Sequence, residues 1–204
     1  MSEQEKNKLV AIDVGHARGT GARGNGLQEH EVCVQLAAYL REALEKRGIS
    51  ADVIDYPGKT NSGDLAETVR EVNAGQYALC VSLHCDSARR VARYEKMIDY
   101  DGLEYEEPVY EDNAGARGAH VIYVSGKGGR AAEAIAAHLC PIMPGRANRT
   151  VRRQNLYILN NTRCPAVLVE CGFLTNSRDA DMLRYEGRRI ALAIAVGVEE
   201  FLNA

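Results

Sequence analysis

Gln76 to His84 reads QYALCVSLH, a nearly continuous apolar run that ends in a histidine. A short apolar run without alternation is typical of a strand that is buried on both faces, as in a parallel sheet. Two other runs share this character: Lys8 to Val14 (KLVAIDV) comes just before His16, and Ala166 to Val169 comes just before Glu170. The three runs predict strands of one parallel sheet, each followed by a polar side chain.

The segments between these runs carry the patterns of helices and further strands. Apolar residues recur at helical spacing in four segments, which are Glu31 to Lys46, Asp64 to Asn73, Gly129 to Leu139 and about Arg184 to Phe201. Short strands are predicted at Ser50 to Tyr56, Gly118 to Val124 and Leu156 to Leu159. Strands that alternate with helices in this way predict a single α/β domain, with a mostly parallel twisted sheet and helices on both faces.

The composition limits the function. The chain has 204 residues, of which 46% are hydrophobic, enough for one domain with a substantial core. Its formal net charge of -3 comes from charges spread along the chain, so no basic stripe favours nucleic-acid binding. No apolar run approaches the roughly 20 residues that cross a bilayer, which predicts no membrane span. The polar N-terminus lacks a secretory signal, so we expect a cytoplasmic protein as encoded, with exported or phage-released forms as alternatives.

The six cysteines do not form a CxxC pair, and most lie inside apolar runs, which predicts buried, reduced thiols. Cys85 directly follows His84, and Cys171 directly follows Glu170. Neighbours on an extended strand point to opposite faces of the sheet. We therefore expect these two thiols to face away from the two polar side chains.

Four polar side chains stand at comparable junctions. His16, His84 and Glu170 follow predicted strands, and Glu29 lies at or just before the first predicted helix. Ligands of parallel sheets bind outside the carboxyl ends of the strands, so one fold can bring these side chains together. A catalytic zinc ion uses three protein ligands and a water, which predicts one zinc ion per chain on His16, Glu29 and His84. Glu170 is then the carboxylate that takes a proton from the zinc-bound water and returns it to a leaving group.

Glu31 and His30 are alternatives to Glu29 as the third ligand, because all three stand in the motif QEHE. Zinc chemistry of this kind cleaves any amide, so a zinc peptidase or carboxypeptidase is a second hypothesis. A catalytically silent binding module is a third.

Four segments resemble the zinc-dependent N-acetylmuramoyl-L-alanine amidases of the amidase-3 type. They are Val10 to Ala22, Gly24 to Ala37, Val81 to Ser87 and Pro165 to Asn176. The resemblance extends from about Lys8 to Leu202, which implies one catalytic domain over residues 8–204 behind a polar tail at residues 1–7. It implies that His16, Glu29 and His84 bind zinc and that Glu170 is the catalytic acid/base. The implied reaction is hydrolysis of the amide between N-acetylmuramic acid and L-alanine in peptidoglycan, and the alternatives become a peptidase acting on stem peptides and a silent wall-binding module.

The chain departs from the family pattern at several places. Asp86 stands where an asparagine is common, and Thr68 occupies the place of a common arginine, whereas Asn73 matches a common asparagine. Asn73 and Asp86 are therefore candidate substrate contacts. Arg152 and Arg153 are further candidates, because arginine suits the carboxylates of a stem peptide.

Residues 87–117 form a long insertion that is rich in acidic residues and tyrosines. The simpler interpretation is a solvated, flexible loop. The sharper hypothesis is that the insertion borders the zinc cleft and contacts glycan or stem peptide through Tyr94, Tyr100, Tyr105 or Tyr110. His120 and His138 occur singly and are expected to be structural or exposed.

Overall fold

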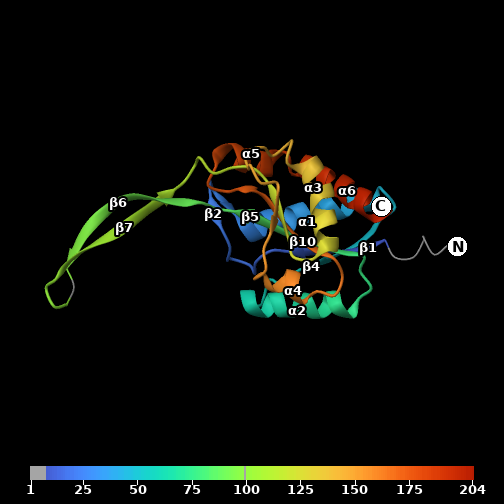
Figure 1. Ribbon diagram of the computed structural model, residues 1–204, viewed down its shortest axis with the longest axis horizontal. Helices are drawn as coiled ribbons and strands as arrows, with labels where there is room; N and C mark the ends of the chain where they lie inside the picture. The colour runs from blue at the N-terminus through green and yellow to red at the C-terminus, as the bar shows by residue number, and fades with distance from the viewer. Residues whose placement is uncertain (1–7, 99) are drawn as a thin grey trace.

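The computed structural model describes residues 8–98 and 100–204, and the predicted polar tail at residues 1–7 lies outside them. Two parts are visible in Figure 1: a body in which helices surround a central sheet, and a long two-stranded arm that projects from it. In the described part of the chain, no helix is long and apolar enough to cross a membrane.

Six strands of the described chain form the central sheet. Their order across the sheet is β4 (Ser50–Ile54), β1 (Leu9–Val14), β5 (Leu79–Asp86), β10 (Ala166–Phe173), β8 (His120–Tyr123) and β9 (Thr150–Arg152). Neighbouring strands are parallel except β8 and β10, which are antiparallel. The three apolar runs are adjacent strands β1, β5 and β10, so their carboxyl ends meet at one edge. The predicted α/β fold with a mostly parallel sheet is confirmed.

Helices cover both faces of the sheet. One face packs against α1 (Glu29–Glu45), α3 (Gly126–Leu139) and α6 (Gly187–Asn203), and the other against α2 (Asn61–Ala74) and α4 (Tyr157–Asn161). Helix α5 (Ser177–Tyr185) follows β10, and the short strands β2 (Arg23–Gly24) and β3 (Leu27–Gln28) form a separate hairpin. Along β1, Val10 and Ile12 belong to the larger apolar core while Ala11 belongs to the smaller one. This alternation explains the unbroken apolar runs, because each strand is buried on both sides.

The prediction of a strand at Leu156 to Leu159 is wrong. Residues Tyr157–Asn161 form helix α4, and the strand of this region is β9, a few residues earlier. Ile158 and Leu159 are both buried, and a run of four residues is too short to distinguish the period of a strand from that of a helix. The Asn161 side chain donates a hydrogen bond to the carbonyl oxygen of Tyr157, four residues before it.

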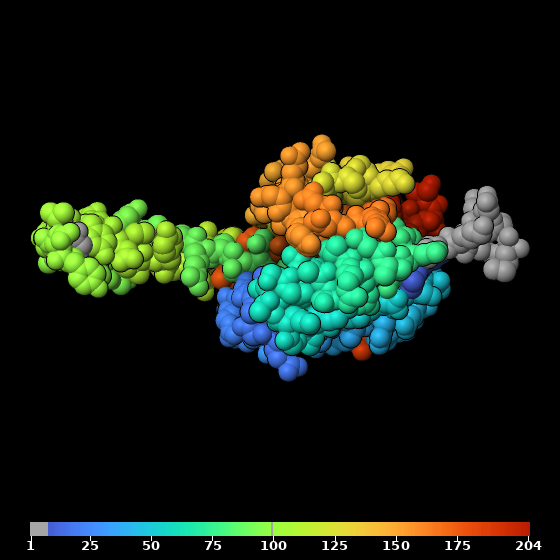
Figure 2. Space-filling view, turned by 90° about the horizontal axis from the view of Figure 1, so that it is seen from below, coloured from blue at the N-terminus to red at the C-terminus, as the bar shows by residue number. Residues whose placement is uncertain are grey.

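The prediction of an unstructured loop in the insertion is also wrong. Residues Arg89–Ile98 form β6 and residues Glu104–Asp112 form β7, which pair in antiparallel fashion. We call this hairpin the arm. Figures 1 and 2 show it extending far from the body, and every described side chain of β6 is exposed. Tyr94, Tyr105 and Tyr110 are exposed along it.

All six cysteines are free thiols, as predicted. Cys164 is half-buried and the other five are buried. Cys33, Cys85 and Cys171 belong to the larger core, on the face that α1 covers. Cys85 and Cys171 therefore point away from their neighbours His84 and Glu170, as the strand alternation predicts.

Candidate active site

His16 stands in the turn that follows β1, with an unusual backbone conformation. Its φ angle is 64°, a left-handed value that side chains rarely adopt. Gly15 allows the turn to pass β5 closely: its N–H donates to the carbonyl oxygen of Leu83 at 2.9 Å, and an added Cβ would lie 2.4 Å from that oxygen. The turn thereby brings the His16 ring to the side of His84, with 5.2 Å between ring centroids.

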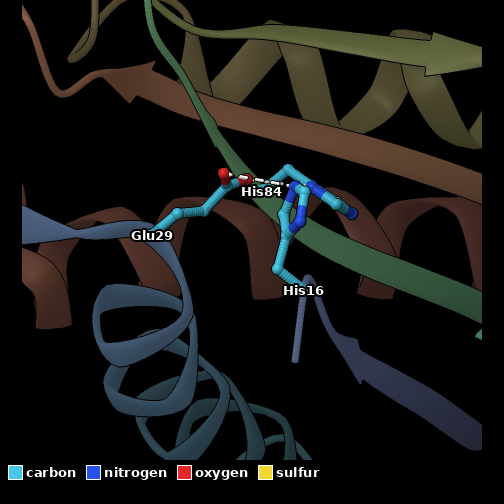
Figure 3. Close-up of side chains that lie close together, drawn as sticks. All are labelled: His16, Glu29 and His84. Atoms are coloured by element: carbon cyan, nitrogen blue, oxygen red, sulfur yellow. Dashed lines mark hydrogen bonds and ion pairs between the residues drawn. The ribbon is translucent and has the colours of Figure 1, made fainter. Parts of the chain in front are cut away.

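Glu29 is the first residue of α1, and its side chain reaches both imidazoles (Figure 3). Oε1 lies 3.0 Å from Nδ1 of His84, and Oε2 lies 3.3 Å from Nε2 of His16. Backbone N–H groups of Cys85 and Ala22 donate to the same two oxygens at 3.0 and 2.7 Å. Four contacts therefore fix the orientation of this buried carboxylate.

The two alternatives to Glu29 lie elsewhere. Glu31 is exposed on α1, and the buried His30 has its Nε2 atom 3.2 Å from Oδ1 of Asp55. Glu29 is thus the acidic residue of QEHE that the fold directs toward His16 and His84.

The three side chains fit a zinc ion. One potential ligand atom from each of His16, Glu29 and His84 lies within 4.8 Å of the others. Two imidazoles and one carboxylate form a donor set that zinc accepts, and three protein ligands leave a coordination position for a reactant. The Glu29 carboxylate also supplies negative charge at the centre of the group.

The surroundings shift the pKa values of the two imidazoles in opposite directions. Burial opposes a charge on His84, but the hydrogen bond with Glu29 and the charges of Glu170 and Glu29 raise its pKa to about 9. Burial lowers the pKa of His16, although Glu29 acts in the opposite direction. Burial also opposes the charge on Glu29, but the His84 hydrogen bond and charge lower the pKa of this carboxyl. Glu29 therefore makes the protonated form of His84 more favourable than that of a free imidazole.

Glu170 stands beside the three residues, opposite His84 in the pairing of β10 with β5. Burial raises the pKa of Glu170 to about 8; the charges of Asp86 and Glu29 add to the rise, and His84 opposes it. Its Oε2 atom is buried, and it has no hydrogen-bond partner among the described residues. A raised pKa and a carboxyl oxygen without a hydrogen-bond partner are both typical of a general acid/base.

A cleft of about 360 Å³ contains all four predicted residues. It is lined by His16, Gly21, Ala22, Glu29, His84, Cys85, Asp86, Ser87 and Glu170. Larger cavities between α3 and other elements contain none of the four. The cleft lies at the carboxyl ends of β1, β5 and β10, where the sequence predicts it.

The weaker candidates divide into two groups. Asp86 lines the cleft, and the positive charge of Arg153 acts on both Asp86 and Glu170. Arg152 is exposed and donates to the carbonyl oxygen of Val124. Asn73 does not line the cleft: it donates to the carbonyl oxygen of Asn161 and accepts from the N–H of Arg163, which ties α2 to the end of α4. No described tyrosine of the arm lines the cleft either.

His120 is one of the two histidines that occur singly and are expected to be structural or exposed. The structure buries this residue and places it opposite Glu170 in the pairing of β8 with β10. The alternation in HVIY places His120 and Ile122 on one face, but the sequence carries no sign of which strand lies next to β8. His138, in contrast, forms an exposed ion pair with Glu200, as expected of an isolated histidine.

Three side chains that could hold a metal ion lie beside a buried carboxylic acid at the carboxyl edge of an α/β sheet, an arrangement that suits a hydrolase. The chain belongs to the N-acetylmuramoyl-L-alanine amidase family, whose sequence profile matches residues 10–200. It is accordingly an amidase.

Individual relatives agree with this assignment. LytC, an N-acetylmuramoyl-L-alanine amidase of Bacillus subtilis (strain 168), is 28% identical over 193 residues, which are 90% of this chain and 34% of LytC. YqiI, an uncharacterized protein of the same organism, is 29% identical over 209 residues, which are 99% of this chain and 88% of YqiI. This chain thus spans about a third of LytC and most of YqiI.

Solved structures share the fold. The catalytic domain of the CD27L endolysin targeting Clostridia Difficile matches with a TM-score of 0.76 and 28% identity, over 94% of this chain and 97% of that domain. The N-acetylmuramoyl-L-alanine amidase AmiC2 of Nostoc punctiforme matches with a TM-score of 0.72 and 26% identity, over 96% of this chain and 97% of that one.

Proposed function

We propose that this amidase hydrolyses the amide between N-acetylmuramic acid and L-alanine in peptidoglycan. One zinc ion on His16, Glu29 and His84 and a general acid/base at Glu170 would carry out the reaction. The observation that carries the proposal is the convergence of these four side chains in one cleft, in a chain whose family has this activity.

The three ligands have distinct roles. His16 and His84 offer neutral imidazole nitrogens, and Glu29 offers a carboxylate oxygen that backbone N–H groups of Ala22 and Cys85 orient. When bound, zinc lowers the pKa of a coordinated water to roughly 7 and polarises a substrate carbonyl. His84 would hold the metal in its neutral form, because a protonated imidazole has no lone pair for a metal.

Glu170 moves the proton between the reactants. It takes a proton from the attacking water and donates it to the nitrogen of the departing L-alanine amine. Burial raises the pKa of this carboxyl above its ordinary value, which helps it to hold the proton between the two steps. Such a group typically contributes about 10²- to 10⁴-fold in rate.

The charge of Arg153 acts on both Glu170 and Asp86, and Asp86 follows His84 by two residues on β5. We assign Arg153, with Arg152 as its exposed neighbour, to the carboxylates of the stem peptide, since a guanidinium binds carboxylates through two donors. Asp86 lines the cleft floor and is placed to accept from a substrate N–H or O–H group. The substrate is insoluble cell wall or a soluble muropeptide, which the chain would reach by export or after phage-type release.

Mass spectrometry of the products from purified peptidoglycan tests the proposal. An amidase releases intact stem peptides, whereas a zinc peptidase releases single amino acids or shortened peptides. Glu170→Ala should retain about one zinc ion per chain and lose hydrolysis by about 100-fold or more. A wild-type protein that binds peptidoglycan without releasing any product is a silent wall-binding module, and an active Glu170→Ala protein excludes the assigned role of Glu170.

A further inference from the structure

His84, Glu170 and His120 form a row across three neighbouring strands. Glu170 is paired with His84 of β5 on one side and with His120 of β8 on the other. Residues that are directly opposite on paired strands share a face of the sheet, with Cβ atoms about 4.5–5.5 Å apart in antiparallel pairs. The carboxyl of Glu170 therefore stands between two imidazoles, of which only His84 belongs to the metal-binding group.

The surroundings of His120 make it an uncharged ring. Its side chain is 2% exposed, and burial together with the positive charges of Arg146 and Arg153 lowers the pKa of His120 to about 4. A neutral imidazole has one nitrogen that donates and one that accepts. Nε2 lies 4.0 Å from Oδ2 of Asp86, so Nδ1 is the ring nitrogen that is left without a polar neighbour.

Two buried atoms in this row lack partners. Within the described chain, neither Nδ1 of His120 nor Oε2 of Glu170 has a hydrogen-bond partner. Buried polar atoms are almost always paired, and exceptions call for an explanation such as a catalytic role. An acceptor nitrogen and a carboxyl oxygen complement each other whenever the carboxyl carries a proton.

We propose that His120 is a positioning residue for Glu170: its Nδ1 accepts a hydrogen bond from the Glu170 carboxyl while that carboxyl holds the transferred proton. The bond fixes the orientation of the acid during the interval in which it holds the proton. The other oxygen of Glu170 then faces the cleft. This inference rests on the proposed role of Glu170 and adds a residue to it.

Steady-state kinetics of two His120 variants on a soluble muramoyl-peptide test the proposal. His120→Leu removes the acceptor, and His120→Asn retains an amide oxygen near the position of Nδ1. We expect His120→Leu to lower kcat by about 10- to 100-fold with little change in KM or zinc content, because part of the contribution of a general acid is lost. His120→Asn should restore most of kcat. The exposed His138→Leu variant is the control and should match the wild type.

The same His120 variant in a protein that lacks the Glu170 carboxyl makes the test specific. In Glu170→Gln protein, His120→Leu should cause no further loss, because the group it positions has been removed. Equal kcat values for His120→Leu and wild type, or for the Leu and Asn variants, would overturn the proposal. If His120→Leu does not fold, His120→Asn and His120→Gln must still differ in kcat at equal KM. A wild-type protein that releases no stem peptide refutes the proposed function itself, which is a separate outcome.

Discussion

The Oε1 atom of Glu29 lies 3.0 Å from Nδ1 of His84, although the two residues are 55 positions apart in the sequence. The other oxygen of the same carboxylate contacts His16. One side chain thus joins two strand ends to the start of a helix. The contact places Glu29 at the centre of the site and predicts how variants of its neighbours behave.

Glu29→Gln should lose zinc, whereas Glu31→Gln should not. Both changes remove one negative charge from the first turn of α1, but only Glu29 faces the imidazoles. Loss of an outer hydrogen-bond partner weakens metal affinity by about 10- to 100-fold, so loss of a ligand should exceed about 100-fold. Metal analysis after dialysis against a weak chelator checks the pair. A Glu31→Gln protein that loses zinc while Glu29→Gln retains it would reverse the assignment.

His16→Gly and His16→Ala should both lose zinc, yet they should differ in stability. The φ angle of 64° is free of strain only for glycine. In metal-free protein, His16→Gly should therefore be more stable than His16→Ala by about 1 kcal/mol in free energy of unfolding. Urea denaturation with excess chelator measures the difference. An alanine variant that is equal or superior in stability would show that position 16 carries no strain.

Removal of the arm should leave the amidase intact. The N–H of Asn113 donates to the carbonyl oxygen of Ala88 at 2.8 Å, so the two ends of the arm already meet and a two-residue Asn-Gly turn can join them. We expect hydrolysis of a soluble muramoyl-peptide to stay within about twofold of wild type, since the described arm residues do not line the cleft. A change in stability should stay within about 0.5 kcal/mol. Tyr94→Ala in the intact chain is the control for a single aromatic contact. A large loss of turnover would restore the hypothesis that the tyrosines reach substrate.

Asp64→Asn should stabilise the protein at neutral pH more than at acidic pH. Burial, with the charge of Asp13, raises the pKa of Asp64 to about 6, above its ordinary value. The folded state therefore holds this proton more tightly than the unfolded chain does. The resulting stability is complete below the unfolded pKa of about 3.9 and is lost as pH rises through 6. The amide cannot ionise, and its oxygen can still accept from the N–H of Tyr56.

The expected gain from Asp64→Asn is about 2 kcal/mol at pH 7.5, declining toward zero near pH 4. Denaturation curves of variant and wild type at several pH values give the difference. Asp181→Asn, at an exposed carboxylate on α5, is the matched control, and its stability should stay within about 0.5 kcal/mol of the wild type. A difference that does not vary between pH 4 and 7.5 would contradict the prediction.

Much of the fold and of the central site follows from the sequence. The unbroken apolar runs before His16, His84 and Glu170 predict strands of one parallel sheet, and parallel strands end at one edge. The choice between Glu29 and Glu31 did not follow from the pattern. It depends on where α1 begins, and a shift of two residues turns a side chain by more than half a helical turn.

Other parts depend on contacts between segments that are distant in sequence. Asn73 matches an asparagine of the family pattern, which made it a candidate substrate contact. Its side-chain amide instead donates to the carbonyl oxygen of Asn161 in α4, which is 88 positions away in the sequence. The hairpin in the insertion is stabilised by cross-strand pairs such as Tyr94 with Pro108, and its mixed composition hides the alternation of a strand. The position of His120 beside Glu170 depends on the antiparallel pairing of β8 with β10.

The reactivity of the buried thiols can be used to detect local opening of the protein. Cys33 lies one helical turn after Glu29, and Cys85 and Cys171 each adjoin a site residue. All three thiols belong to the larger apolar core, between α1 and the sheet. A thiol reagent added to native protein finds half-buried Cys164 first, since the other five are sealed in the interior. Labelling of Cys33 or Cys85 would indicate that α1 has separated from β5. Mass spectrometry of modified peptides can therefore distinguish simple metal loss from a physical opening of the catalytic end, without any engineered probe.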